Sequence, residues 1–326
     1  MTWYALEEIE EALGETKDLL LPFDLGTWSK LALIVLLTGS GFNMPNMGNS
    51  LSSQPGQYNQ YDDYQGFGDG IDSMNIPESS TPVNTLQTDP NFSSLMTGLG
   101  VSSTVIIVLA LVMLVIGIPL ILLSSIFEFI FYQSLIDKDV KIRENFSRHF
   151  WKGMRYFGFQ LIYAIAVLGI LAAAVAAVMA SNALLVVALL ISLPVIFVMG
   201  IFASLTHDFI LLKMMEEDKS LIQAWRSFWP TLKSEWKQVT VYLIVKFFIG
   251  IVVGISAAIV VIIATVIMVI PIIIFAVLFA MISEVLVLLP VLLGLIAWFV
   301  VILYISVPFR VYIYYFIVLV YHDLTA

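Results

Sequence analysis

Long apolar runs separated by short charged segments dominate the hydrophobic pattern of this chain. Three long runs cover residues 101–136, 156–212 and 238–309, and a shorter one covers 31–42. A helix needs about 20 residues to cross a hydrocarbon core about 30 Å thick, so the long runs hold one, two and at least two spans in turn. Counting the short run as a slightly short crossing, we predict an all-α polytopic membrane bundle of six transmembrane helices.

The third long run leaves alternatives open, because its 72 residues could also hold four short crossings. A second alternative has two crossings with a re-entrant piece over 262–290, near Pro271 and Pro290. We favour two long, tilted helices, because each of the other hairpins has two helices.

The positive charges agree with this count independently of hydropathy. All 15 Lys and Arg lie outside the ranges 31–137, 156–212 and 247–309. Positive charge concentrates on the cytoplasmic side of membrane proteins, so the chain crosses an even number of times between successive basic clusters. We therefore predict a multi-pass protein of the cell membrane with both termini in the cytoplasm.

Two stretches about 80 residues apart resemble each other. The sequence after Glu128, "EFIFYQSLIDKDVKIRENFSRHFW", aligns with "DFILLKMMEEDKSLIQAWRSFWP" from Asp208. In both, a span ends with a carboxylate and a Phe-Ile pair, and an aromatic and basic segment leads into the next span. A similar order precedes the first span. The chain is therefore interpreted as one membrane domain, 1–326, of three helix hairpins that form an internal repeat.

The segments 137–156 and 217–237 are predicted to be cytoplasmic interfacial segments. Tryptophan rings anchor at the headgroup level of a bilayer, and neighbouring Lys and Arg face phosphates. The simplest interpretation of these segments is that they anchor the protein at the membrane surface, and the alternative is that they form a binding site for lipid headgroups. The residues assigned to this face are Trp28, Trp151, Arg155, Trp225, Arg226, Trp229 and Trp236.

Two polar segments flank the first predicted span. Residues 1–22 are predicted to form an acidic cytoplasmic amphipathic helix with an apolar stripe, and we expect this helix to dock on the chain's own basic segments. An acidic and polar N-terminal sequence argues against a cleaved signal peptide.

Residues 43–100 are predicted to form an acidic, low-complexity extracellular loop without a basic residue. Its "DDYQGFGDGID" has oxygen ligands and glycines but lacks the spacing and terminal Glu of an EF-hand. The apolar stripe of the helix predicted over residues 1–22 consists of Trp3, Leu6, Ile9 and Leu13.

Composition removes several function classes. The chain is 60 % hydrophobic and only 12 % charged, and it contains no cysteine, which excludes disulfides and thiolate chemistry. The three histidines are far apart in sequence, and no metalloprotease, nucleophile-elbow, phosphate-loop or dinucleotide motif occurs. We expect no enzyme, no catalytic residue, no cofactor, no metal and no nucleic-acid partner.

Charged residues within apolar runs are the strongest candidates for a functional site, because they are expensive in lipid. Glu128 and Asp208 end equivalent spans, and Arg310 lies near the corresponding end of the sixth. We predict an intramembrane charge cluster of Glu128, Asp208 and Arg310 with His207 beside it. Pairing at helix ends is the structural alternative to a functional role, and Arg310 could instead extend to the headgroups.

These segments together resemble a known group of proteins. The N-terminal "WYALEEIEEALGETKDLLLPFDLGTWSK", the polar loop, "ENFSRHFWKGMRYFGFQL" and "HDFILLKMMEEDKSLIQAWRSFWPTLKSEW" are similar to an uncharacterised family of multi-pass membrane proteins from halophilic archaea. More distantly, the pattern is similar to the membrane domain of glycerophosphodiester phosphodiesterases. That resemblance implies a six-helix fold and work near lipid headgroups, but no activity, because their catalytic domain is missing here.

Two classes of function remain. The first is a non-enzymatic integral membrane protein that binds lipid headgroups, or another membrane protein, through its basic, Trp-rich cytoplasmic face. The second is a small transporter or channel with a path between the hairpins. A packed bundle with lipid-filled grooves favours the first, and a continuous polar cavity favours the second.

Overall fold

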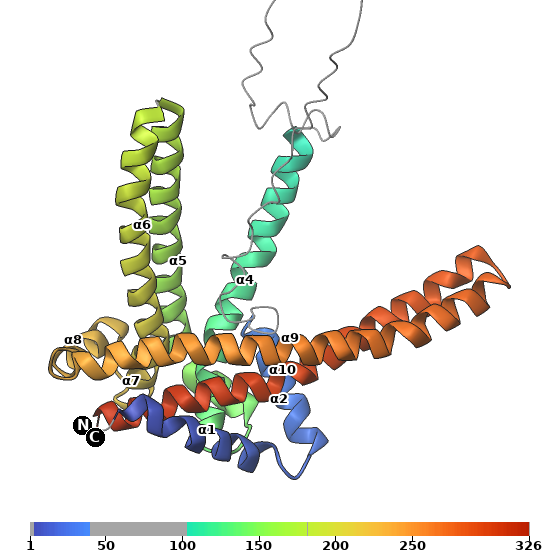
Figure 1. The fold of residues 1–326 in the computed structure, drawn as a ribbon, viewed down its shortest axis with the longest axis horizontal. Coiled ribbons are helices and arrows are strands. Elements are labelled where there is room, and N and C mark those ends of the chain that lie inside the picture. Colours follow the sequence, from blue (N-terminus) through green and yellow to red (C-terminus); the bar gives the residue numbers. More distant parts are fainter. Residues whose placement is uncertain (1–2, 40–102, 181, 326) are drawn as a thin grey trace, which may run out of the picture. The chain divides into compact units, whose positions relative to one another are not determined.

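The computed structural model describes residues 3–39, 103–180 and 182–325, and all its regular elements there are helical (Figure 1). The predicted acidic loop 43–100 lies outside the described residues. A π-helical turn, η1 (Thr206–Ile210), joins α6 to α7, and a 3₁₀ turn, η2 (Glu284–Val287), precedes α10. The α-helices are α1 (Tyr4–Leu20), α2 (Leu25–Leu37), α4 (Ser103–Ile136), α5 (Ile142–Ala180), α6 (Asn182–Leu205), α7 (Leu211–Glu216), α8 (Leu221–Ser234), α9 (Trp236–Ala280) and α10 (Leu288–Thr325).

Five helical stretches among the described residues are long and apolar enough to cross a membrane, which confirms the prediction of a multi-pass membrane protein. They fall in α4, α5, α6 with α7, α9, and α10. The short run predicted at 31–42 corresponds to α2, which has 13 residues and a length of about 20 Å. Because this length is less than the hydrocarbon thickness, the sixth crossing stays a prediction.

The chain divides into two compact units, Met1–Gly48 with Ile118–Ala326, and Asn49–Gly117. Their boundary lies within α4. The following description concerns the larger unit.

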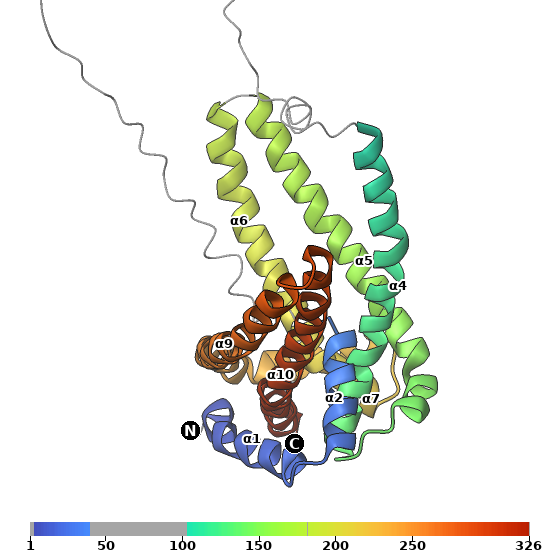
Figure 2. The ribbon, with the colours of Figure 1, turned by 90° about the vertical axis from the view of Figure 1, so that its right-hand side faces the viewer.

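The core surrounds the C-terminal half of α10. From Val307 onward this helix buries side chains on every face, as a helix does when it is enclosed by others. Helices α1 and α2 pack against α10, and α9 runs alongside it (Figure 2). The end of α4 also contributes, because Phe131 packs against Tyr314 with tilted rings whose centroids are 4.5 Å apart. Elements η1 and α7 also pack into this core, where Phe209 of η1 and Leu211 of α7 are fully buried.

Two pairs of helices form hairpins. Helices α5 and α6 contact each other, as do α9 and α10 (Figure 1). Helix α9 continues without interruption through Pro271 to Ala280, so the segment 262–290 forms the end of a helical hairpin. Near this end, the Trp298 indole donates a hydrogen bond of 3.0 Å to the Thr265 hydroxyl.

Local signals explain where the interfacial elements begin. Asp218 has a positive φ of 50°, and the capping box of Ser220 with Gln223 then starts α8. Residues 142–156 instead continue directly into the apolar part of α5, because Gly153 and Gly158 do not break the helix. The segment 217–237 therefore contains a separate helix, whereas most of 137–156 belongs to a long one.

The docking face of α1 differs from the predicted one. The side chains buried against the rest of the unit are Ala5, Glu8, Ala12, Thr16 and Leu20. Leu6 and Leu13, from the predicted stripe, are exposed by 53 % and 46 %. Small residues let α1 approach α10 and α9 closely, and the large apolar residues border this contact. The basic segments contribute the ion pair of Lys138 with Glu15, at 2.6 Å.

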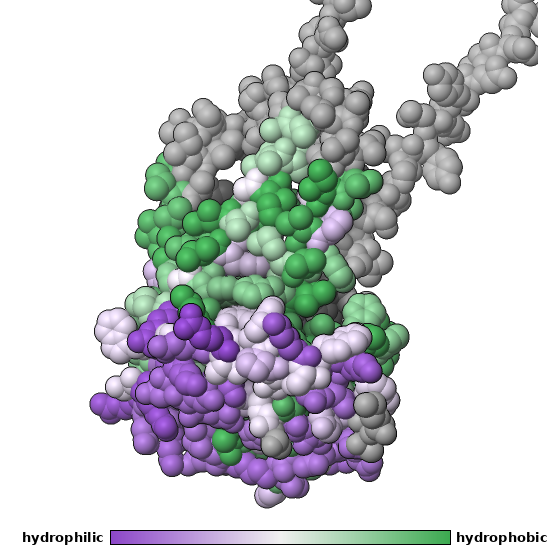
Figure 3. Space-filling model, turned by 90° about the vertical axis from the view of Figure 1, so that its left-hand side faces the viewer, coloured by the Kyte–Doolittle hydropathy of each residue, from purple (hydrophilic) through white to green (hydrophobic). Residues whose placement is uncertain are grey.

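One face of the molecule is divided by polarity. Apolar residues gather in the upper part of Figure 3, and hydrophilic residues cover the lower part. The α5 and α6 hairpin carries exposed apolar side chains such as Ile162, Ile165 and Phe197. Such a surface is stable in hydrocarbon and would be unstable in water, as expected for a protein embedded in a bilayer.

Candidate functional site

A cluster of charged side chains lies buried where α4, η1 and α9 meet. Glu128 comes from the last third of α4, His207 and Asp208 come from η1, and Lys246 comes from the first third of α9. Asp208 has no exposed surface, and Glu128 is also buried. A π-helical turn adds a residue to a helix and is frequent at functional sites. Here it places the two consecutive residues His207 and Asp208 in the same cluster.

His207 connects the two carboxylates. Its Nε2 contacts Oε1 of Glu128, and its Nδ1 lies 3.0 Å from Oδ1 of Asp208. A carboxylate accepts hydrogen bonds, so both contacts are satisfied when each ring nitrogen carries a proton. The geometry therefore matches a protonated imidazolium ring between two ionised carboxylates.

Asp208 is surrounded by donors. Its Oδ2 contacts the Lys246 ammonium, and it accepts hydrogen bonds from the Tyr242 hydroxyl at 2.9 Å and from the Ser204 hydroxyl at 3.1 Å. The Lys246 ammonium also lies 3.0 Å from the Ser204 hydroxyl. A buried charge needs this degree of pairing, because an unpaired one costs several kilocalories per mole.

Glu128 is less completely paired. Its Oε1 accepts a hydrogen bond of 2.5 Å from the Tyr314 hydroxyl in addition to the contact with His207. Its Oε2 is buried and has no hydrogen-bond partner among the described residues. This oxygen can accept a water molecule or carry a proton. Tyr132, from the same helix, donates instead to the His207 carbonyl at 3.3 Å.

The four titratable groups balance in charge. Two carboxylates face one ammonium and one imidazolium, so the cluster is neutral when His207 is protonated. The side chains of His207 and Lys246 are 29 % and 27 % exposed, whereas that of Asp208 has no exposed surface. Chemically, the cluster can hold helices together, and it can exchange a proton.

The structure thus brings together three of the four residues that the sequence assigned to this cluster. Arg310, the fourth, is half-buried on α10, one turn before Tyr314, and interacts electrostatically with its phenol. Lys246 supplies the ion pair to Asp208. It was not among the residues predicted for this cluster, although it is an isolated lysine among apolar residues in "VYLIVKFFIGI".

The Trp-rich face centres on a groove beside α8. Trp225 stacks on Phe202 of α6 with ring centroids 4.5 Å apart, and its indole donates a hydrogen bond of 3.2 Å to the Thr206 hydroxyl. The groove has a volume of about 430 Å³ and is lined by Phe159, Phe202, Leu221, Ile222, Trp225, Arg226 and Trp229. Arg226 is the charged member of this lining. We call this feature the α8 groove.

The remaining residues of the predicted face lie apart from the lining of this groove. Trp151 is exposed on α5, as is Arg155 one turn later. Trp236 is exposed at the start of α9, with the Lys237 ammonium 5.9 Å from its ring centroid. Trp28 is half-buried on α2, and its indole donates to the Leu20 carbonyl at 3.1 Å.

Among the described residues, no group of three or more His, Asp and Glu is arranged to hold a metal ion.

Comparisons with known proteins give a family but no activity. A search of curated proteins and a search of solved structures returned no match. A family model, in contrast, matches residues 3–326, which is nearly the whole chain. The chain, an integral membrane protein with a buried charged cluster and a Trp-lined groove, therefore belongs to the family of unknown function DUF7544.

Proposed function

We propose that the protein is a non-enzymatic membrane protein that binds an anionic phospholipid in the α8 groove. The observation that carries this proposal is a groove with apolar and aromatic walls that lies beside the exposed Arg226. A phospholipid presents the same combination, an apolar chain joined to a charged phosphate. Arg226 can donate to the phosphate as a planar fork, while the walls contact the chain.

The surroundings of the groove favour an anionic ligand. Exposed arginines at positions 148 and 155 of α5 act electrostatically on Asp218, just before α8, so the basic part of α5 lies near this end of α8. Lys152 makes an ion pair of 2.8 Å with Asp218. Basic residues at an anionic membrane surface contribute about 1 kcal/mol each.

The exposed apolar side chains of α8 suit a position at the membrane boundary. Ile222 and Trp229 are 75 % and 50 % exposed, and they lie on the same helix as Arg226. A soluble protein would gain by covering such residues, whereas an interfacial helix inserts them among acyl chains. The Lys233 ammonium lies 5.5 Å from the ring centroid of Trp229, where it keeps its charge near the headgroups.

The proposal includes a topology. The basic segments and both termini face the cytoplasm, and α2 makes a sixth, short crossing that completes three hairpins. The confinement of Lys and Arg to a few segments supports this orientation. The resemblance to membrane proteins of halophilic archaea, and the distant similarity to phosphodiesterase membrane domains, agree with work near lipid headgroups.

Lipid binding can be tested with the purified full-length protein in mixed micelles. Native mass spectrometry would compare retention of phosphatidylglycerol with retention of phosphatidylcholine. We expect preference for phosphatidylglycerol, and Arg226→Gln should reduce it about five-fold, which corresponds to the loss of about 1 kcal/mol. Lys30→Gln on α2 is the matched control, and it should leave the preference unchanged. Equal retention of both lipids, or equal effects of the two variants, would contradict the proposal.

A transporter is the second candidate, because the charged cluster can exchange a proton and its two cations are partly exposed. Proton-coupled transporters place such carboxylate and histidine relays within their spans. Proteoliposomes with an internal pH indicator would separate the two functions. Transport requires a proton flux that Asp208→Asn abolishes, whereas a lipid-binding protein gives no flux with either form.

A further inference from the structure

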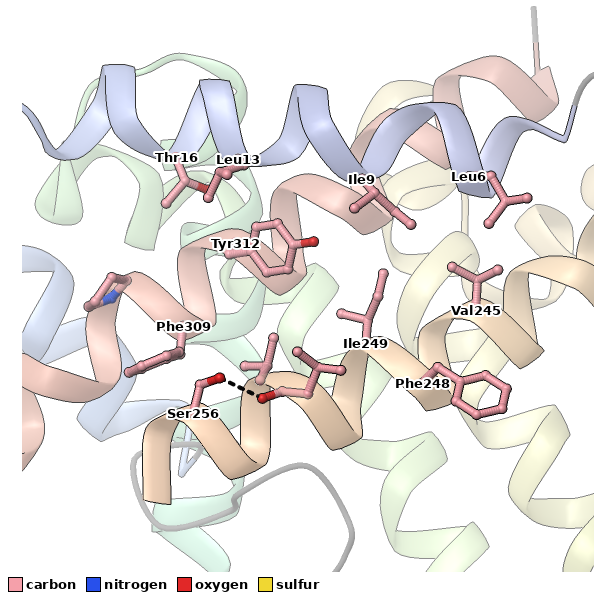
Figure 4. Close-up of a pocket in the computed structure, with 13 residues that line it drawn as sticks. Leu6, Ile9, Leu13, Thr16, Val245, Phe248, Ile249, Ser256, Phe309 and Tyr312 are labelled. Carbon is pink, nitrogen blue, oxygen red and sulfur yellow. Dashed lines mark hydrogen bonds between the residues drawn. The ribbon is translucent and has the colours of Figure 1, made fainter. Parts of the chain in front are cut away.

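A second groove lies between α1 and the α9 and α10 hairpin. It has a volume of about 610 Å³, and Figure 4 shows side chains from all three helices facing it. Helix α1 contributes Leu6, Ile9, Leu13 and Thr16; α9 contributes Val245, Phe248, Ile249, Val252, Val253 and Ser256; and α10 contributes Pro308, Phe309 and Tyr312. We call this feature the α1 groove.

The walls of the α1 groove suit an apolar occupant. Thr16 donates its hydroxyl to the Ala12 carbonyl at 2.7 Å, and Ser256 donates to the Val252 carbonyl at 2.8 Å. Both hydroxyls are therefore used within their own helices, which leaves mainly hydrocarbon for a ligand. A polar ligand would lose its hydration in this groove without receiving hydrogen bonds from these two groups.

The groove continues into the surface that faces lipid. Phe248 and Val252 line it and are 60 % and 63 % exposed, and the same side of α9 continues through the exposed Ile255 and Ile259. These residues belong to a candidate membrane span. An acyl chain in contact with that span can therefore enter the groove without crossing water.

One of the contacts between α1 and α10 involves two carboxyl groups. Glu8 is buried on the face of α1 that meets α10, and its side chain is hydrogen-bonded to Asp323. Two carboxyl groups can share a hydrogen bond only while one of them keeps a proton. The Oε2 atom of Glu8 is buried without a hydrogen-bond partner among the described residues, so an ionised Glu8 would be poorly stabilised there.

We propose that α1 is a proton-dependent strap that encloses a lipid acyl chain in the α1 groove, with the Glu8 and Asp323 pair as its latch. Protonation of the pair holds α1 against α10 and closes the groove. Ionisation of both carboxyl groups makes them repel each other, so α1 separates and the chain is released.

The charges around the latch support this direction. Burial, the hydrogen bond with Asp323, and the charges of Asp323, Glu11 and Glu7 raise the pKa of Glu8 to about 7 from its ordinary value of 4.5. Helix α9, the other helix packed on α1, lines the groove with apolar side chains near this contact. Among other charged groups of these elements, His322 pairs with Glu216 at 3.3 Å, and Glu15 with Lys138.

The sign of the pH dependence follows from this raised pKa. The docked helix binds a proton more tightly than the released one, so docking is favoured below pH 4.5 and weakens as the pH rises to about 7. The proposed change therefore falls within a range that can be reached without denaturing the protein.

The strap can be measured by the distance between two spin labels in the full-length protein in nanodiscs. The chain contains no cysteine, so Gly14→Cys on α1 and Lys237→Cys on α9 give unique sites. Gly14 faces open space, and both positions are exposed, so the labels should not disturb packing. At pH 5 we expect one narrow distance distribution, and at pH 8.5 a longer and broader one.

Two variants separate the latch from a general effect of pH. Glu8→Gln keeps a hydrogen-bond donor for Asp323 but cannot ionise, so the narrow distribution should persist at pH 8.5. Asp323→Asn should act in the same direction. Glu10→Gln, which changes an exposed carboxylate of the same helix, should retain the wild-type transition. A distribution independent of pH, or one with the same transition in Glu8→Gln as in Glu10→Gln, would overturn the strap.

The occupant is tested with phosphatidylcholine that carries a photoreactive diazirine in its acyl chain. At pH 5 we expect crosslinks to α1 between residues 6 and 13, and at least a ten-fold decrease at pH 8.5. Val253→Phe, which fills the groove, should remove these crosslinks, and the exposed Ile263→Phe on the same helix should retain them. Crosslinks to α1 that persist in Val253→Phe, or the lack of crosslinks to α1 in the wild type at pH 5, would overturn the acyl-chain site.

Discussion

Replacement of Lys246 tests directly how much the buried charged cluster contributes to the stability of the protein. The Lys246→Met variant keeps the length of the side chain but removes the ammonium that contacts Asp208. Asp208 has no exposed surface, so its carboxylate would stay inside the protein with one cation fewer. The remaining donors at its oxygens would be His207, Tyr242 and Ser204, at 3.0, 2.9 and 3.1 Å.

Two arguments give the same size for this loss. Unit charges about 4 Å apart attract each other by about 4 kcal/mol at an effective dielectric constant of about 20. Removal of one partner from a buried ion pair typically costs 3–5 kcal/mol, because the other charge is left uncompensated. We therefore expect Lys246→Met to lower the free energy of unfolding by about 4 kcal/mol.

The assay is unfolding of the purified protein by sodium dodecyl sulfate in mixed micelles, followed by tryptophan fluorescence. The double variant Lys246→Met with Asp208→Asn removes both charges, so it should recover at least half of the loss. Lys30→Met on α2 is the control and should change stability by less than about 0.5 kcal/mol. The reasoning is refuted if the losses of the two cluster variants simply add, or if Lys246→Met resembles the control.

Three further predictions address packing, capping and topology. Gly153→Val should destabilise the protein by about 1–3 kcal/mol, because even a Cβ at this position would lie 2.8 Å from the Ile126 Cα; a thermal-unfolding series with Gly158→Val as the control, where space is open, tests this. Ser220→Ala should cost about 1 kcal/mol by removing the α8 capping box, measured by detergent denaturation. In intact cells, an impermeant thiol reagent should label Ser283→Cys but leave Ser147→Cys unmodified, and the reverse pattern would invert the proposed topology.

Hydropathy and charge were enough to predict the helical membrane class. Each long run coincides with one or two of the helices α4, α5, α6, α9 and α10, because an apolar stretch of this length has few alternatives in lipid, but α5 starts before its run, at Ile142, and α10 continues past 309 to Thr325. The short crossing was harder to predict. Asp24 accepts a hydrogen bond from the Thr27 amide at 2.8 Å, which starts α2 six residues before the apolar run, and the helix ends at Leu37.

Side-chain pairing was only partly predictable. Glu128, His207 and Asp208 are isolated polar residues in apolar runs, which singled them out. The ion pair between Lys246 and Asp208 depends on how α9 packs against η1. The sequence around either residue does not determine this packing. The prediction of which face of α1 docks against the protein was wrong for a related reason. Hydrophobicity identifies the largest apolar side chains, whereas close helix contact selected small residues such as Ala5 and Ala12.

The central claim, a lipid site in the α8 groove, is tested most directly by an electron cryo-microscopy map of the full-length protein in nanodiscs that contain phosphatidylglycerol and phosphatidylcholine. We predict density in the groove, with a phosphate within hydrogen-bond distance of the Arg226 guanidinium and an acyl chain along Phe202 and Trp229. A groove without lipid density, or one filled by the protein's own side chains, would contradict the claim.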